Sequence, residues 1–162
     1  MAQLAANRPV PNTLAQRLDL AGGVVLDMVM TASTTIYEGA LVGYVPGTGT
    51  IHPLVNADCF AGIALEGKVS NATAGSTKCK VYACGYFQHA ITSLAVTDVG
   101  KVCFCVSGTS DSSIDVASTT LPAIGRVASF VSTGIGIIHM KDCGQRAGSS
   151  DAATLRYVAV EN

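Results

Sequence analysis

Three histidines, His52, His89 and His139, are the side chains of this sequence best suited to acid–base or metal chemistry near neutral pH. A histidine that acts as a base needs a partner to orient it, and a zinc site needs further ligands at short spacing. Each of the three falls on a separate predicted strand or strand end, and neither spacing nor a neighbouring carboxylate connects them. We therefore expect structural histidines and no metal site.

Six cysteines are the other candidate ligands, at positions 59, 79, 84, 103, 105 and 143. Zinc sites favour pairs two to four residues apart on turns, and the sequence has no C-x-x-C. Cys103 and Cys105 alternate along a predicted strand and share a face, whereas Cys79 and Cys84 point to opposite faces. We expect free, largely buried thiols, as is usual for a chain made in a reducing compartment. Disulfides formed between subunits after cell lysis are the alternative.

Other catalytic patterns are missing from the sequence. It has neither the nucleophile motif G-x-S-x-G nor the zinc-binding motif H-E-x-x-H. The glycines of residues 46–49 (P-G-T-G) do not form a phosphate-binding loop, because no Gly-Lys-Ser/Thr and no helix follow them. We expect those glycines to supply the positive φ angles of a hairpin. The acids mostly flank predicted turns, where carboxylates bond to local amides: Glu38, Asp58, Glu66, Asp98 and Asp115. Nothing here argues for an enzyme, and we expect no catalytic residue and no cofactor.

The surface of this chain is poor in charge. Charged residues make up 13% of the 162 residues, where about 25% is usual, and mean hydropathy is +0.42. A 16.5 kDa monomer exposes about 7,500 Å², so its charges are widely spaced. We therefore expect much of the surface to be covered by copies of the chain or by a partner. An ordinary soluble β-domain rich in Ser and Thr is the alternative.

Nucleic acid and membrane are disfavoured as partners. Net charge is −1, with no basic run and no stripe of Lys or Arg interleaved with aromatic residues. Arg8, Pro9 and Pro11 interrupt the N-terminus before any apolar signal segment, and no apolar stretch is long enough to span a bilayer. We expect synthesis in the cytoplasm, without secretion or membrane insertion.

Residues 39–87 predict the strands around which the chain is organised. Glycines, β-branched residues and alternating hydrophobicity predict strands over residues 40–45, 51–55, 60–65 and 78–87, with a polar loop over 67–77. Val81, Ala83 and Phe87 are expected on one face of the last strand, opposite Lys80, Tyr82, Cys84 and Tyr86. Residues 24–30 are expected to form a first core strand.

The same plan recurs about 60 residues later. Predicted strands over 101–106, 113–117, 124–128 and 134–140 follow the order of the first set, and residues 88–99 are expected to join the two. Two copies suit two half-barrels that close on each other. The sequence therefore predicts an all-β protein with a small barrel, at residues 23–141, built from two similar strand-turn-strand units.

Both ends of the chain are expected to differ from this barrel. In residues 1–22, Pro9 and Pro11 favour an extended arm that lies on a neighbouring molecule, and a solvated terminus is equally compatible. Residues 142–162 begin as a polar tail and end in an alternating segment, residues 155–160. This segment could close the home barrel or add to the sheet edge of another subunit.

The order of short motifs resembles small tailed-phage capsid decoration proteins, also called cement or head-stabilising proteins. The motifs are F-A-G-I-A at 60–64, N-A-T-A-G at 71–75, G-Y-F at 85–87, D-V-G-K at 98–101 and I-G-R-V at 124–127. The resemblance covers residues 24–141, roughly three quarters of the chain. The N-terminal arm, the tail and the number of cysteines depart from the family pattern.

The resemblance implies a β-barrel or tulip-like domain that forms homotrimers, is made in the host cytoplasm and sits on the outer surface of the expanded capsid. There it would bridge capsomers of the major capsid protein and stabilise the head against DNA pressure. On this basis we expect shell contacts from the arm, and contacts between subunits from the terminal strand. The shell candidates are Leu4, Arg8, Val10, Leu14, Arg17 and Leu18, and the subunit candidates are Leu155, Tyr157 and Val158.

Two other classes remain open. Another virion component, such as a tail, head-fibre or minor shell subunit, would share the β content and the low charge. A host-glycan attachment module would need exposed aromatic residues in loops, but the chain has no Trp and most of its Tyr residues fall in or beside predicted strands.

Overall fold

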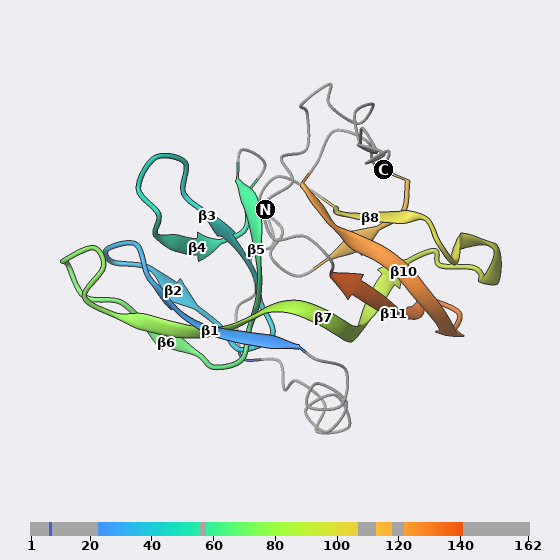
Figure 1. Cartoon of the computed structure of the whole chain (residues 1–162), viewed down its shortest axis with the longest axis horizontal. Coiled ribbons are helices and arrows are strands. Elements are labelled where there is room, and N and C mark those ends of the chain that lie inside the picture. The colour runs from blue at the N-terminus through green and yellow to red at the C-terminus, as the bar shows by residue number, and fades with distance from the viewer. Residues whose placement is uncertain (1–6, 8–22, 56–57, 107–112, 118–121, 141–162) are drawn as a thin grey trace, which may run out of the picture.

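The computed structural model describes residues 7, 23–55, 58–106, 113–117 and 122–140, which are nearly all β-structure (Figure 1). The first half contains β1 (Val24–Val29), β2 (Thr35–Ile36), β3 (Leu41–Tyr44), β4 (Ile51–Pro53), β5 (Cys59–Ala64) and β6 (Lys68–Val69). The long β7 (Lys78–Thr92) leads to a 3-10 turn, η1 (Val96–Asp98), and then to β8 (Val102–Cys105), β9 (Ile114–Asp115), β10 (Ala123–Ser132) and β11 (Ile135–Met140). The all-β prediction is confirmed. Within the described residues no helix has the length and apolar character needed to cross a bilayer.

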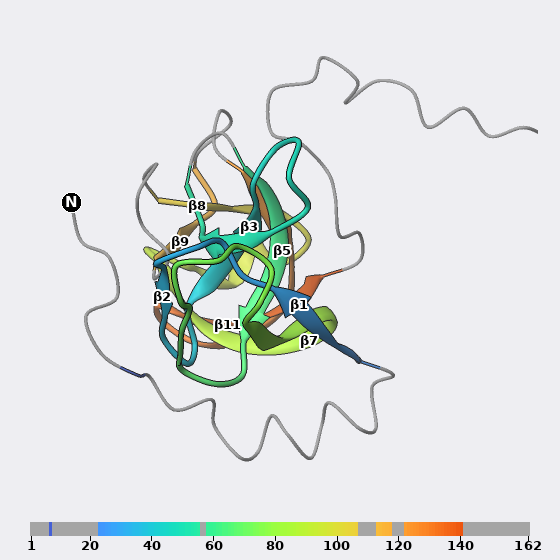
Figure 2. The same cartoon turned by 90° about the vertical axis from the view of Figure 1, so that its left-hand side faces the viewer.

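The strands before residue 85 form a closed ring, which we call ring 1. Residues 78–84 of β7 pair with β1 on one side and with β5 on the other, and β5 continues through β3 to β4. A parallel bridge between Met30 and Ile51 then joins the end of β1 to β4. Figure 2 views the molecule from this side. The short strands β2 and β6 pair separately, and β6 lies inside residues 67–77, which were predicted as a loop.

Residues 85–92 of β7 begin a second closed ring, ring 2. They pair with β11, and the sheet continues through β10 and β8 to β9. β9 pairs in parallel with the end of β7, which completes a five-stranded barrel. In Figure 1, ring 1 lies on the left, ring 2 on the right, and β7 runs through both.

Ring 2 repeats ring 1 at the level of single hydrogen bonds. The Gly39 N–H donates to the Ala64 carbonyl oxygen at 2.8 Å, and the Gly100 N–H donates to the Val127 carbonyl oxygen at 2.7 Å. The parallel closures also match, since the Met30–Ile51 bridge in ring 1 corresponds to the pairing of Ile91 with Ile114 in ring 2. The predicted internal repeat is therefore confirmed.

The predicted manner of closure was wrong. We expected two half-barrels closing on each other, with residues 88–99 as a connection, but each unit closes on itself. β7 continues to Thr92, as the last strand of ring 1 and the first of ring 2. The reason is visible in its burial, because Phe87, His89 and Ile91 are buried while the residues between them are exposed.

The two rings share an apolar interface. The interior of ring 1 is filled by residues such as Met28, Val42, Ile51 and Val81. Side chains on the other face of its strands join the interior of ring 2 in one buried cluster, to which ring 1 contributes Leu41, Leu54, Phe60, Ile63 and Tyr82. Tyr82 lies on the face opposite Val81 and Ala83, as expected, but that face is covered as well, and Tyr82 is 1% exposed. Ring 2 covers the outer face of ring 1 at this point.

β1 also differs from its prediction as a core strand. Residues 24–27 are exposed, and the strand enters the interior only at Met28. A register shift between Val24 and Val25 displaces the start of the strand relative to β7. Four of the six residues of this strand therefore lie outside the core.

Candidate functional site

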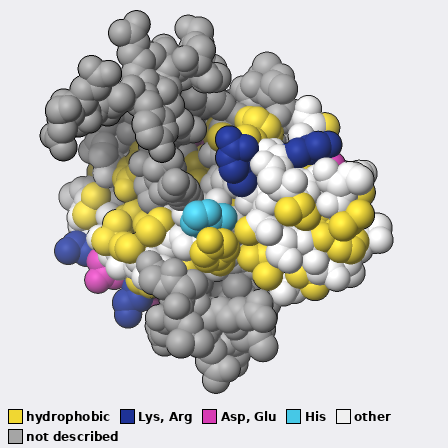
Figure 3. Space-filling model, turned by 45° about the vertical axis from the view of Figure 1, so that its right-hand side comes forward, with side chains coloured by type: hydrophobic (Ala, Val, Ile, Leu, Met, Phe, Trp, Pro, Cys, Tyr) yellow, Lys and Arg dark blue, Asp and Glu magenta, His cyan; other side chains and the backbone are white. Residues whose placement is uncertain are grey.

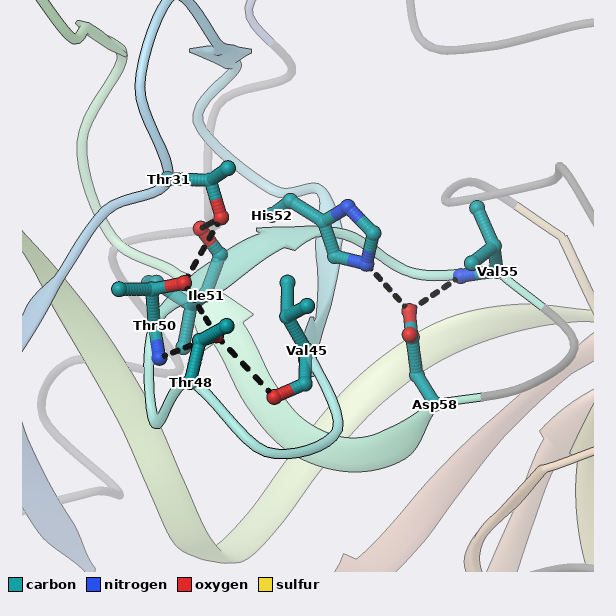
Figure 4. A network of polar contacts seen from close by, with 8 residues as sticks. All are labelled: Thr31, Val45, Thr48, Thr50, Ile51, His52, Val55 and Asp58. Carbon is teal, nitrogen blue, oxygen red and sulfur yellow. Dashed lines mark hydrogen bonds and ion pairs between the residues drawn. The ribbon is translucent and has the colours of Figure 1, made fainter. Parts of the chain in front are cut away.

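The most chemically suggestive contact in the described residues joins His52 to Asp58. His52 Nε2 lies 2.8 Å from Asp58 Oδ2, which also accepts the Val55 N–H at 2.8 Å (Figure 4). The Asp58 side chain is 2% exposed and the His52 side chain 24%. The prediction that no carboxylate connects to a histidine was wrong for His52. The Asp58 N–H donates to the Val55 carbonyl oxygen at 3.1 Å, and the Asp58 carboxylate, six positions along the chain from His52, lies against the imidazole.

This pair holds a turn, because Asp58 Oδ2 contacts both the His52 imidazole and the Val55 amide. The three threonines near it in Figure 4 bond among themselves, with Thr50 Oγ1 3.0 Å from Thr31 Oγ1 and 2.8 Å from Thr48 Oγ1. Among the described hydrogen bonds, none links a hydroxyl nucleophile to the His52 ring. The described residues also contain no group of three or more His, Cys, Asp or Glu side chains that could hold a metal ion.

Other carboxylates bond to turn amides, as the sequence predicts. Asp98 Oδ2 accepts the Ala95 N–H at 2.8 Å, and Asp98 Oδ1 accepts a hydrogen bond from Lys101 Nζ at 2.7 Å. The lysine hydrogen bond and then the amide lower the pKa of Asp98, although burial opposes them. Asp115 Oδ1 likewise accepts the Val116 N–H at 2.6 Å. Glu66 differs, because its Oε1 accepts the N–H of Lys80, a residue of strand β7, at 3.0 Å.

The described cysteines are free thiols. Cys103 and Cys105 both point into ring 2, as their spacing predicts, and burial raises the pKa of Cys103 to about 12. Cys79, inside ring 1, has a pKa raised to about 11, mainly by burial and then by the nearby Glu66. Cys59 and Cys84 are partly exposed. The buried thiols therefore pack as small apolar groups, and Cys143 lies outside the described residues.

The surface feature that stands out is apolar. Val24, Val25 and Leu26 are consecutive on β1 and are 41%, 48% and 45% exposed; we call them the β1 row. Val24 pairs with Cys84, two residues before Tyr86 on β7. Tyr86 is 39% exposed and stacks on His139, with ring centroids 4.2 Å apart. Figure 3 shows hydrophobic side chains gathered on one face beside a histidine. Such a surface suits contact with another protein.

The interface residues expected from sequence lie outside the described residues. This holds for the arm candidates Leu4, Arg8, Val10, Leu14, Arg17 and Leu18 and for the tail candidates Leu155, Tyr157 and Val158. The described residue of the arm is Asn7, whose Oδ1 accepts the Glu38 N–H at 3.1 Å. The arm therefore touches its own ring 1 at this point. The β1 row was missed because an alternating apolar strand looks the same in sequence whether or not a partner element covers it.

A scan against protein-family models and searches of curated proteins and of solved structures returned no match to this chain. We therefore infer its function from its framework and its surface.

Proposed function

We propose that this protein is a capsid decoration protein of a tailed phage. It binds the outer surface of the expanded head, bridges neighbouring capsomers and stabilises the shell against the pressure of packaged DNA. The observation that carries the proposal is the β1 row, three adjacent apolar residues exposed on a closed framework. Apolar residues gathered on a rigid, charge-poor surface favour a role in protein assembly.

The framework supports a mechanical role. Each ring closes its own sheet, and β7 runs through both rings without a break, so force applied to one ring is carried to the other by a continuous strand. A buried cluster that includes Tyr82 and Phe87 packs the rings together. Such a unit resists bending between two attachment points, which is what bridging two capsomers requires.

No catalysis is needed for this activity. A protein that binds the expanded shell in preference to the unexpanded shell shifts the equilibrium toward the expanded state by its differential binding free energy. An interface of ordinary size, about 1,600 Å², is sufficient at each site because it is repeated over the whole lattice. The shell contacts are assigned to residues 1–20, whose Arg8 and Arg17 would pair with acidic residues of the major capsid protein.

Co-sedimentation with heads of the source phage tests the proposal. We expect the full chain to bind expanded heads saturably, to leave unexpanded heads unbound, and to lose binding when residues 1–20 are removed. Arg8→Glu should weaken binding, whereas Arg126→Glu is the matched control because it makes the same charge change on ring 2. Equal binding to both head forms, or binding to neither, would sink the proposal. Binding to tails in place of heads would assign the chain to another part of the virion.

A further inference from the structure

The turn before β3 in ring 1 matches the turn before β8 in ring 2. The Ala40 N–H donates to the carbonyl oxygen three residues earlier at 3.1 Å, and the Lys101 N–H does the same at 3.0 Å. Gly39 and Gly100, the residues before these donors, both have a positive φ angle. The repeat therefore allows the two turns to be compared residue by residue.

The backbone amide that precedes the glycine has a different partner in each ring. In ring 2 this amide belongs to Val99, and it donates to the Val96 carbonyl oxygen at 3.4 Å, inside the turn. In ring 1 it belongs to Glu38, and it donates to Oδ1 of Asn7 at 3.1 Å, across 31 positions of the sequence. A contact that ring 2 makes within the turn is therefore made in ring 1 by the N-terminal arm.

Gly67 leaves the space that the Asn7 side chain occupies. A Cβ added at Gly67 would lie 2.5 Å from Asn7 Oδ1, 3.1 Å from its Nδ2 and 3.2 Å from its Cγ. The φ angle of Gly67 lies outside the range that favours glycine, so the backbone conformation does not require this residue type. Three residues after the matched Ala64 and Val127, ring 1 has Gly67 where ring 2 has Phe130. The glycine is therefore a feature of the contact with Asn7 and is not shared by the repeat.

We infer that ring 1 carries a binding site for the Asn7 side chain, and that this site anchors the N-terminal arm to the body of its own chain. We call it the arm site. It consists of the Glu38 N–H, whose hydrogen bond the Asn7 carbonyl oxygen accepts, and the open space beside Gly67. Asparagine suits the site because its short side chain ends in an acceptor oxygen.

Anchoring shortens the reach of the arm. An extended chain spans at most about 3.5 Å per residue, so an arm of residues 1–22 attached only at Gly23 would reach about 75 Å. The six residues before Asn7 reach about 20 Å from the arm site. Arg8 directly follows Asn7, so the shell contact expected of Arg8 would lie beside this corner of ring 1. This consequence rests on the proposed function, whereas the anchor itself does not.

A pair of introduced cysteines tests the anchor. A Cβ at Gly67 would lie 3.2 Å from Asn7 Cγ, which brings the two Cβ atoms within disulfide range. On mild oxidation, Asn7→Cys/Gly67→Cys should form a disulfide within one chain, measured by non-reducing electrophoresis and peptide mass mapping. Asn7→Cys/Gly75→Cys is the matched control and should stay unlinked, because nothing lies within 4 Å of a Cβ at Gly75. A link between two chains, or no link, would overturn the inference.

Hydrogen exchange tests the same contact without oxidation. In Asn7→Ala, the Glu38 amide should exchange about fivefold faster, the equivalent of about 1 kcal/mol for one hydrogen bond. Gly67→Ala should have the same effect, because its Cβ displaces the Asn7 side chain. The Val99 amide is the internal control and should keep its rate in both variants. An unchanged Glu38 rate in Asn7→Ala would contradict the anchor.

Binding to expanded heads separates this inference from the proposed function. Asn7→Ala should weaken binding of the full chain, because an arm that is not anchored loses more conformational freedom when it binds. Head binding equal to that of the wild type would refute the role of the arm site in presenting Arg8. A disulfide within one chain, together with a wild-type protein that binds no heads, would support the anchor and remove the proposed function.

Discussion

The paired glycines of the repeat, Gly62 and Gly125, provide a quantitative test of the double-ring fold. Both lie where one strand approaches the backbone of the next. A Cβ on Gly62 would lie 2.3 Å from the Tyr82 carbonyl oxygen, and a Cβ on Gly125 would lie 2.4 Å from the His139 carbonyl oxygen. These oxygens belong to strand backbone and cannot move without disturbing the ladder. Alanine at either position should therefore destabilise the protein.

The expected size of the effect follows from two terms. Overpacking against backbone costs about 1–3 kcal/mol, and Gly62 also has φ +146°, which adds about 1 kcal/mol or more for any residue with a side chain. We expect Gly62→Ala to lower the free energy of unfolding by about 3 kcal/mol and Gly125→Ala by about 2 kcal/mol. Gly75→Ala is the control, because Gly75 has φ +79° with nothing within 4 Å of the added Cβ, and should cost about 1 kcal/mol.

Urea unfolding followed by circular dichroism measures these differences. The chain has no Trp, so tyrosine fluorescence is the second probe. If Gly62→Ala and Gly125→Ala each cost no more than Gly75→Ala, the close approach of the strands in the two rings is refuted.

Three further predictions concern titration, the buried carboxylate and the thiols. The hydrogen bond from Lys101 lowers the pKa of Asp98, so the stabilising contribution of Asp98 is complete above about pH 4 and is lost as pH falls through the lowered pKa. Asp98→Asn should therefore flatten the acid limb of the stability–pH curve, measured by urea unfolding. Asp58→Ala should lower the free energy of unfolding by about 2 kcal/mol, because it leaves the partly buried Val55 amide and the His52 imidazole without their partner. An unchanged urea midpoint would contradict that role. In the native protein at pH 8, iodoacetamide should label the partly exposed Cys59 and Cys84, while the buried Cys103 stays unmodified. Peptide mass mapping measures the labelling. Rapid labelling of Cys103 would mean that ring 2 opens.

Most strands, and the repeat, could be predicted from sequence because both depend on local patterns. Alternating hydrophobicity and turn glycines placed β3, β4, β5 and β8 to within a few residues, and the similar order of motifs revealed the second unit. The continuation of β7 was missed because Gln88 and His89 are polar and look like a connection. His89 is nevertheless buried, at the ring 2 position that corresponds to Met28 in ring 1.

The remaining misses concern contacts between segments. The pairing of His52 with Asp58 depends on how one turn folds back, which the types of the residues do not encode. The burial of Tyr82 and the exposure of Leu26 depend on where the two rings touch. Sequence periodicity predicts which residues share a face of a strand, but the arrangement of the rings decides whether that face is covered.

Cryo-electron microscopy of expanded heads of the source phage, saturated with this protein, tests the central claim most directly. We predict extra density on the outer surface of the shell that spans capsomer boundaries, accommodates two joined β-rings and is missing from unexpanded heads treated in the same way. An expanded shell whose outer surface is unchanged by the protein would contradict the proposed function.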